Sequence, residues 1–484
     1  MKEQVNKVMQ HYRMKRLLEH MVGPIGSIIF HILIVVVAVK FMIFDQAEKP
    51  AEIEVMIMEA DAQKLEEFEK ELEQLDVLPD VTDAMMPPDD VQMNVEAPSE
   101  NPGPVSEDVT TDLAALNVMS DVQSPLIMKG LYAGRSSGGR ATALGQYGGK
   151  WGAYTEASVV KALEWLRLNQ KPDGSWEPKS DAPAMTGLAL LAFLAHGETT
   201  ASEKYGPTVE KAIRFLVSVQ KPGGELTEIN QHGVYEHAIA TYAVSEAYGL
   251  TRIPSLKPVM EKATAVILAG QQPGGSWDYH YKKEGRADLS VAGWQIQALK
   301  SALMSGAENP GLKEAIEKAV ECVKTFQNPE HGLFGYTDNK VGASMRPSMT
   351  GVAVLCLQLG GHADTPEARK GLNALQSADC DWNQPTEWPM YAWYYITQAK
   401  YHRGGSEWQA WNNDFAREFT KNQNADGSWN TPSKTHEVAQ GPVYATALAA
   451  LTLQVYYRFL PSYKPIVVEP AGGKQSDDIS IDIM

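Results

Sequence analysis

From about residue 157 the chain repeats a pair of hydrophobic patterns. The first member of each pair is amphipathic at helical spacing, and the second is almost uniformly small and apolar. These patterns are typical of a half-solvated outer helix and of a helix buried on nearly all sides. Outer helices are predicted at 157–170, 208–220, 257–271, 313–327, 368–376 and 408–423, and inner helices at 185–197, 235–249, 289–306, 348–361, 388–402 and 442–460.

Each outer helix ends in a glutamine that precedes a Pro/Gly/Asp-rich turn and an apolar, usually aromatic, residue. Successive glutamines are 50, 51, 56, 49 and 47 residues apart, which indicates an internal repeat. We expect the glutamine to close the helix end, where carbonyl groups lack partners, and glycines such as Gly174, Gly275 and Gly427 to allow positive φ. The six copies are Gln170 with Trp176, Gln220 with Leu226, Gln271 with Trp277, Gln327 with Phe334, Gln376 with Trp382, and Gln423 with Trp429.

Twelve helices in strict outer–inner alternation predict an all-α fold, an (α/α)6 toroid over residues 151–460. An open solenoid is the alternative, because a two-helix repeat can also stack linearly. The Gln…Asp-Gly-Ser-Trp repeats resemble the QW motifs of the squalene–hopene cyclase, oxidosqualene cyclase and protein prenyltransferase superfamily over about 300 residues. The resemblance implies the toroid, and it implies a structural role for the motifs.

An apolar segment at 21–44 is long enough to cross a bilayer as one helix. Lys and Arg residues are concentrated in the segment before it, 1–20, and acids follow it, so the positive-inside bias places the N-terminus in the cytoplasm. A cleaved signal peptide is the weaker alternative, because the apolar core is long and no small-x-small site follows it. The pattern predicts a single-pass inner-membrane protein with a periplasmic toroid.

Ser27 and His31 lie four residues apart and therefore share one face of this helix. This Ser-x-x-x-His element resembles the membrane anchor of the TonB and TolA family, which implies a proton-channel partner of the TolQ or ExbB type. Ala38 and Met42 stand where that family has further characteristic residues, and no counterpart of its receptor-binding domain is visible. A plain anchor with a tolerated histidine is the alternative.

Residues 45–150 are predicted to be an acidic, Pro/Gly-containing linker, with a short helix at 58–76. The linker carries −15 of the net charge of −17, residues 1–44 carry +4, and residues 151–484 carry −6. The predicted toroid therefore has no basic face, which argues against nucleic-acid binding. Residues 461–484 are a C-terminal tail.

The sequence lacks the motifs of several chemistries. Its three cysteines form no C-x-x-C pair, which excludes a thiolate zinc ribbon, and no Asp-Asp-x-x-Asp run for diphosphate-bound magnesium is present. The Asp-x-Asp-Asp acid motif that the resemblance to triterpene cyclases would imply is also absent. The run around Cys380 is interpreted as a degenerate turn, because Asp379 aligns with Asp173 and Asp426 of other repeats. No metal and no cofactor are predicted.

Turns that enter the inner helices place acids, bases and aromatic residues around the mouth of the predicted ring. The catalytic candidates are Glu236, His237, Asp288 and Glu387, and the ligand-binding candidates are Arg286, Arg346, Trp388, Tyr391, Tyr394, Tyr395 and Tyr444. The acids could serve a glycan-cleaving enzyme with aromatic sugar platforms. The favoured alternative is that they cap helices and pair with one another, as Asp288 before Leu289 would with Arg286 beside it.

These features favour a membrane-anchored binding or scaffold module, without cyclase activity, whose mouth engages a lipid, isoprenoid, glycan or protein. The alternative is an enzyme acting on a terpenoid or a polysaccharide. A cyclase predicts a large, dry, aromatic-lined cavity. A glycan-cleaving enzyme predicts two carboxylates about 5–10 Å apart in an open groove. A scaffold predicts a ring filled by its own side chains.

Overall fold

The computed structural model describes residues 132–176, 182–230, 232–338, 345–432 and 435–458, all within one compact unit that spans 92–484. The predicted anchor at 21–44, with Ser27 and His31, lies outside the described residues, as do the short helix at 58–76 and the tail. Among the helices that are described, none combines the length and the apolar character that a membrane span requires.

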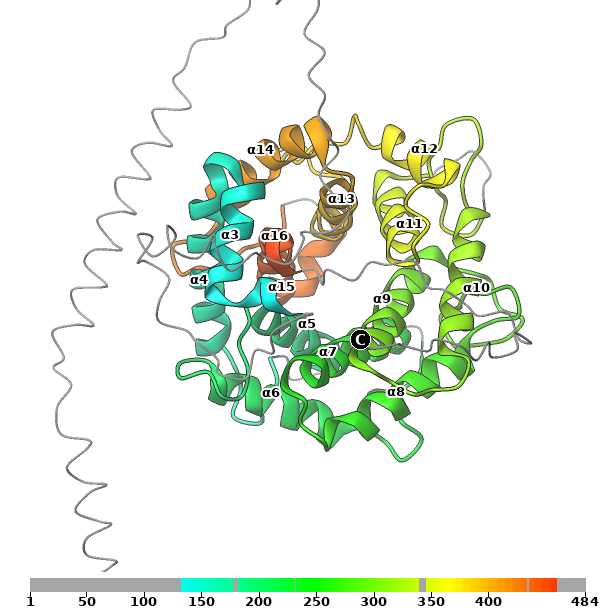
Figure 1. Cartoon of the computed structure of the whole chain (residues 1–484), viewed down its shortest axis with the longest axis horizontal. Helices are drawn as coiled ribbons and strands as arrows, with labels where there is room; N and C mark the ends of the chain where they lie inside the picture. Colours follow the sequence, from blue (N-terminus) through cyan, green and yellow to red (C-terminus); the bar gives the residue numbers. More distant parts are fainter. Residues whose placement is uncertain (1–131, 177–181, 231, 339–344, 433–434, 459–484) are drawn as a thin grey trace, which may run out of the picture. The chain divides into compact units, whose positions relative to one another are not determined.

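The six inner helices form a closed ring (Figure 1). Each packs against the next in chain order, and the last packs against the first, so the toroid is confirmed and the open solenoid is not. They are almost entirely buried, as uniformly apolar helices require. The inner helices are α5 (Ala182–Ala195), α7 (Gly233–Thr251), α9 (Leu289–Ser305), α11 (Pro347–Leu359), α13 (Pro389–Arg403) and α15 (Gly441–Leu453).

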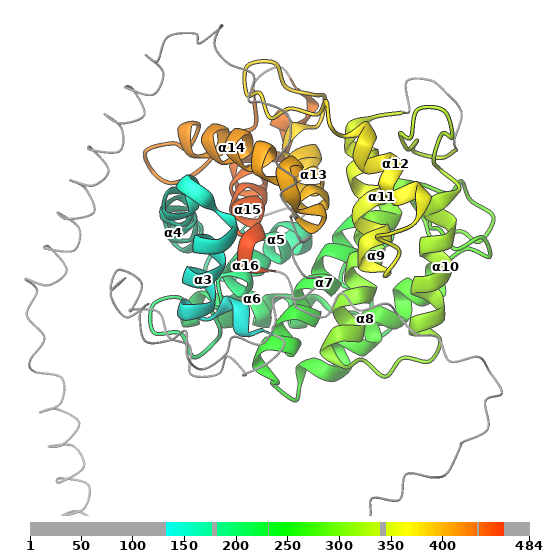
Figure 2. The same cartoon turned by 45° about the horizontal axis from the view of Figure 1, so that its top comes forward.

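The outer layer surrounds this ring, and Figure 2 shows it from a second direction. Each outer helix packs chiefly against the inner helix that precedes it and less against the one that follows, and α4 packs on α15, which closes the outer layer. All twelve predicted helices are present. The outer helices are α4 (Gly152–Leu168), α6 (Gly206–Val219), α8 (Leu256–Gly270), α10 (Leu312–Lys324), α12 (Pro366–Ala374) and α14 (Gly405–Lys421).

The repeat glutamines join consecutive outer helices, which is more than the helix-end role expected of them. In the first repeat the Gln170 amide donates to the carbonyl of Gly174 in its own turn (3.1 Å) and to that of Thr208 on α6 (2.9 Å). Gln423 closes the circle by donating to the carbonyl of Ser158 on α4 (2.8 Å). The glutamines at 220, 271 and 327 repeat this double contact.

The motif tryptophans and glycines fit the same turns tightly. Trp277 is fully buried, and its indole N–H donates to the carbonyl of Ile267 near the end of α8 (2.9 Å). Gly275 has a φ of 102°, and a Cβ at this position would collide with the Lys318 carbonyl oxygen of the next outer helix. This turn therefore needs glycine both for its backbone conformation and for close approach.

The fifth repeat departs from the others, as its degenerate sequence indicates. Gln376 donates to the Glu407 carboxylate (3.1 Å) instead of to a backbone carbonyl. Trp382 is only half-buried, and it lies against Trp393 and Phe419 with ring centroids 5.2 and 5.4 Å apart. Asp379 contributes its carbonyl to the Trp393 indole N–H (3.1 Å), which is a structural contact.

The domain begins earlier than residue 151, the boundary drawn from the sequence. Residues 132–150, assigned there to the linker, contain the short helix η3 (Ala133–Arg135) and α3 (Ser137–Tyr147), which pack on the ring. At the other end, the helix predicted at 442–460 breaks after Leu453 and resumes as α16 (Val455–Arg458), which lies inside the ring (Figure 1). Residues 132–150 lack the apolar periodicity of the repeats, which is why the sequence did not assign them to the domain.

Candidate functional site: the mouth of the ring

Asp288 stands at the start of α9 and is completely buried. One carboxylate oxygen accepts the backbone N–H groups of Ser290 and Val291 (3.0 and 3.4 Å), and the other accepts a guanidinium N–H of Arg286 (2.9 Å). Asp288 was expected to be either a catalytic acid or a helix cap, and the structure shows that it caps α9.

Glu236 and His237 lie in the first turns of α7. Glu236 is buried and accepts a hydrogen bond from the Thr227 hydroxyl (3.0 Å). His237 is fully buried: its Nδ1 accepts the Leu226 N–H (3.1 Å) and its Nε2–H donates to the Ala263 carbonyl (3.0 Å). These partners require the neutral imidazole, and burial lowers the pKa of His237 to about 4. The histidine thus ties a turn to α8.

This buried histidine should make stability depend on pH. Its folded pKa lies below the unfolded value of about 6.5, so its contribution is complete above that pH and is lost as pH falls toward 4. As the pH falls from about 6.5 to about 4, we expect the protonation of His237 to lower the free energy of unfolding by about 3 kcal/mol. Urea titrations at pH 4.5 and 7.0 should show a smaller pH effect in His237→Gln, whose amide can both accept and donate. An unchanged pH effect would contradict this assignment.

Glu387, Arg346 and Trp388 lie just before α11 and α13. Glu387 forms ion pairs with Arg346 and with the Nδ1 atom of His436 (3.1 Å), and its side chain is 40% exposed. Trp388 is half-buried at the N-cap position of α13. Glu387 is therefore the one catalytic candidate among the described residues with a substantially exposed carboxylate.

Tyrosine rings gather at the same end of the ring, around Asp288. The hydroxyl of Tyr235 contacts that of Ser290 (2.7 Å), and its ring lies 5.9 Å from that of Tyr279. Burial, and after it the negative charge of Asp288, raises the pKa of Tyr235. Burial likewise raises the pKa of Tyr391, with further contributions from Tyr336 and Asp288. These rings come from four different repeats, so the fold brings them together.

Two arginines lie over these rings. The Arg286 guanidinium is 5.6 Å from the Tyr279 ring centroid, and that of Arg346 is 6.0 Å from the Tyr336 ring centroid. The four rings are half-buried, and the Arg286 side chain is 61% exposed. The mouth thus presents aromatic faces beside exposed cationic donors, a combination that suits polar ligands with apolar faces.

Glu437 is a mouth residue that the sequence analysis did not single out. It lies in η5 (His436–Gln440), is fully buried, and accepts the backbone N–H groups of Met390 and Tyr391 at the start of α13 (2.8 and 2.9 Å). The Tyr444 hydroxyl donates to the same carboxylate (2.9 Å). Burial raises the pKa of Glu437 to about 7 despite these hydrogen bonds, so the group exchanges its proton near neutral pH.

Tyr394 and Tyr395, predicted to contact a ligand, lie in the buried interior of the ring. Tyr394 stacks on Trp294 (5.6 Å between centroids), donates to Gln297 (3.1 Å) and accepts a hydrogen bond from Arg458 of α16 (2.7 Å). The Tyr395 hydroxyl accepts from Gln297 (2.8 Å). All five side chains are buried. The chain's own groups therefore occupy the axis at this level.

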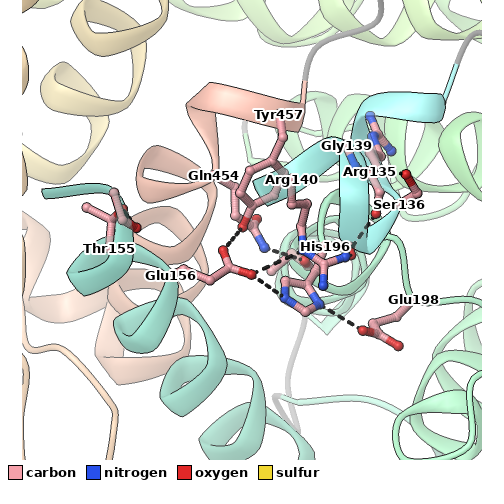
Figure 3. A network of polar contacts seen from close by, with 12 residues as sticks. Arg135, Ser136, Gly139, Arg140, Thr155, Glu156, His196, Glu198, Gln454 and Tyr457 are labelled. Atoms are coloured by element: carbon pink, nitrogen blue, oxygen red, sulfur yellow. Dashed lines mark hydrogen bonds and ion pairs between the residues drawn. The ribbon is translucent and has the colours of Figure 1, made fainter. Parts of the chain in front are cut away.

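The opposite end of the ring, which we call the floor, carries a buried ionic network centred on His196 (Figure 3). His196 contacts the carboxylates of Glu156 (3.0 Å) and Glu198 (2.8 Å), and Arg140 of α3 also binds Glu156 (3.1 Å). The Tyr457 hydroxyl donates to the other Glu156 oxygen (2.7 Å). Burial alone would raise the pKa of Glu156, but His196 and Arg140 lower it to about 2.

Arg135 holds the segment before α3 against the floor. Its guanidinium pairs with Glu246 of α7 (2.5 Å) and donates to the carbonyls of Arg458 (2.7 Å) and Leu194 (3.3 Å). Cationic donors at helix C-terminal ends satisfy carbonyl groups that lack intrahelical partners. The clue in the sequence is the pair of arginines in the otherwise small and polar stretch at 134–140, which could have indicated docking.

No family model matches the chain. An MMP endo-(1,4)-3-O-methyl-α-D-mannosidase of Mycolicibacterium hassiacum is 33% identical over 98 residues, covering 17% of this chain and 27% of that enzyme. A lanosterol synthase of Aspergillus fumigatus is 28% identical over 134 residues, covering 25% of this chain and 17% of that enzyme. The chain thus spans only a small part of either relative. The second match confirms the resemblance to the squalene cyclase superfamily.

Solved structures that superpose on part of the chain come from several enzyme classes. They include an α-1,6-mannanase of Salegentibacter sp. HEL1_6 (13% identical, 63% of this chain, 98% of that chain, TM-score 0.48). A D-mannose isomerase also matches (12% identical, 64% of this chain, 98% of that chain, TM-score 0.49). So does a type II terpene cyclase of Scytonema (13% identical, 66% of this chain, 98% of that chain, TM-score 0.45). At such identities and TM-scores these matches carry no conclusion about activity.

Proposed function

We propose that this protein binds carbohydrate at the mouth of its toroid. The observation that carries the proposal is the cluster of half-buried tyrosine rings beside Arg286 and Arg346. Aromatic faces pack against the apolar faces of sugar rings, while charged donors bind the hydroxyl groups. The match to a protein named as a mannosidase adds support for a carbohydrate ligand.

The disposition of the carboxyl groups favours binding over hydrolysis. A glycoside hydrolase of the usual kind needs two carboxyl groups flanking the scissile bond. Asp288 and Glu437 are fully buried and already cap α9 and α13, while the exposed Glu387 is paired with Arg346 and His436. A triterpene cyclase is less well supported, because Arg458 and its partners occupy part of the axis.

Glycan cleavage is the second candidate function, and Glu437 is the residue that favours it. A carboxyl group with a pKa of about 7 is partly protonated at neutral pH, as a general acid must be, but Glu437 is fully buried and would have to become accessible before it could reach a substrate. Incubation of wild type and Glu437→Gln with soluble mannan, followed by analysis of reducing ends, decides this case. Cleavage by the wild type that is lost in the variant would establish an enzyme.

The apolar segment at 21–44 supports the further proposal of an inner-membrane anchor with the toroid in the periplasm. Ser27 and His31 support a proton-channel partner for that anchor. Recovery of the full chain in the soluble fraction of disrupted cells would contradict the anchor. Unchanged membrane partners after His31→Leu in a cross-linked pull-down would contradict the coupling.

The mouth can be tested with a matched pair of tyrosines. Tyr279 lies under Arg286 at the mouth, and Tyr248 lies under Arg252 (5.2 Å) near the far end of α7. In affinity electrophoresis through gels containing soluble mannan, we expect Tyr279→Ala to weaken retardation of the full chain at least about tenfold. Tyr248→Ala should leave it unchanged. The proposal would be contradicted if both variants were retarded equally. It would also be contradicted if mannan in the gel did not retard the wild type.

A further inference from the structure

A cluster of metal-binding side chain types lies on the outer layer, away from the mouth. Glu317 and Glu321 are one turn apart on α10 and therefore point to one side of that helix. His362 follows the C-terminal end of α11, in the turn that leads to α12. One ligand atom from each of the three side chains lies within 4.8 Å of the other two.

The imidazole of His362 lies between the two carboxylates. Its Nε2 is 3.0 Å from Oε1 of Glu317, and its Nδ1 is 3.6 Å from Oε1 of Glu321. A neutral imidazole carries one N–H, so its second nitrogen presents a lone pair to a carboxylate. A metal ion bound at that nitrogen would take the facing carboxylate as a further ligand.

The backbone holds His362 firmly in this position. Its N–H donates to the Leu357 carbonyl at the end of α11 (2.7 Å), and its own carbonyl accepts from the N–H (3.2 Å) and hydroxyl (2.9 Å) of Thr365. The three side chains remain between 19% and 54% exposed, so an ion can reach them from solvent. The cluster is thus both pre-positioned and accessible.

We propose that Glu317, Glu321 and His362 bind a divalent transition-metal ion. Two carboxylates and one imidazole suit zinc, manganese or cobalt, whereas calcium and magnesium prefer oxygen ligands alone. Solvent would supply the remaining ligands. Lys324 pairs with Glu321 (2.5 Å) and competes with the ion for that carboxylate. The bound ion would fasten α10 to the end of α11 within the fourth repeat.

Isothermal titration of the full chain in detergent, freed of metal by chelator, with zinc and with manganese tests the site. We expect one site per chain, weakened at least about tenfold by His362→Gln and by Glu317→Gln. Lys324→Gln should tighten binding, because it removes the competing cation. Glu314→Gln is the matched control, since it removes an exposed carboxylate from the same helix, and it should bind as the wild type does.

A second measurement separates this site from adventitious binding. Cobalt added to the wild type should give a visible spectrum without thiolate-to-metal charge transfer, although Cys322 lies next to Glu321 in the sequence. Zinc should also raise the melting temperature of wild type and Glu314→Gln but not of His362→Gln. A thiolate band, or equal binding by His362→Gln and Glu314→Gln, would overturn the proposal.

Discussion

Replacing Arg135 with methionine should lower the free energy of unfolding by about 3–5 kcal/mol, the cost typical of breaking a buried ion pair from one side. The substitution leaves the buried carboxylate of Glu246 without its guanidinium partner. It also removes donors from the carbonyls of Leu194 and Arg458. Urea unfolding of the full chain in detergent, followed by circular dichroism, measures the loss.

Arg167→Met is the matched control for this experiment. Arg167 pairs with Glu164 on α4 at 2.6 Å, but both side chains are about one-third exposed. Such a pair is worth less than about 1 kcal/mol, because water screens both charges. If both substitutions cost the same, the contacts of the segment 132–147 with the floor do not stabilise the domain.

Replacing Gly275 with alanine should destabilise the protein by about 3 kcal/mol. The residue adopts a φ of 102°, which side-chain-bearing residues rarely adopt, and the added methyl group would meet the Lys318 carbonyl of α10. That carbonyl belongs to a helix backbone and cannot swing away as a flexible side chain could. The melting temperature should fall accordingly, because one turn and the adjacent helix must separate.

Gly274 in the same turn provides the control. A Cβ built there meets nothing within 4 Å. Gly274→Ala should therefore be neutral, or should stabilise by up to about 1 kcal/mol, since alanine restricts the unfolded chain. A loss in Gly274→Ala as large as that in Gly275→Ala would show that the turn's backbone conformation and close packing do not explain the glycine.

The sequence could predict the features that recur regularly along the chain. Apolar patterning along the twelve helices and the recurrence of Gln and Trp predicted the toroid, because each repeat buries the same faces. Local chemistry was also visible: Asp288 could be expected to cap α9 from its position before an apolar run. Asp379 could be recognised as part of a degenerate turn by alignment with Asp173 and Asp426.

The features that the sequence could not predict are contacts between distant parts of the chain. Arg135 and Arg140 lie in a small, polar stretch with no apolar periodicity, and their carboxylate partners, Glu246 and Glu156, lie in other helices. Glu437 caps α13 from the turn after the sixth motif, 46 and 47 residues away from its two donors. Such pairings depend on how separate segments pack together in the folded domain, so no local sequence pattern predicts them.

The hydrogen bond from Gln423 to Ser158 joins residues 265 positions apart, and that from Gln454 to Ala192 joins residues 262 apart. Early repeats can form from local contacts as the chain is made, but these two bonds must wait for the last repeat. Until then the growing arc has two apolar flanks, at α5 and at the newest inner helix. Linear repeat proteins cover such flanks permanently with capping repeats. Here each flank covers the other, so the folding of the sixth repeat is itself the event that buries these two apolar edges.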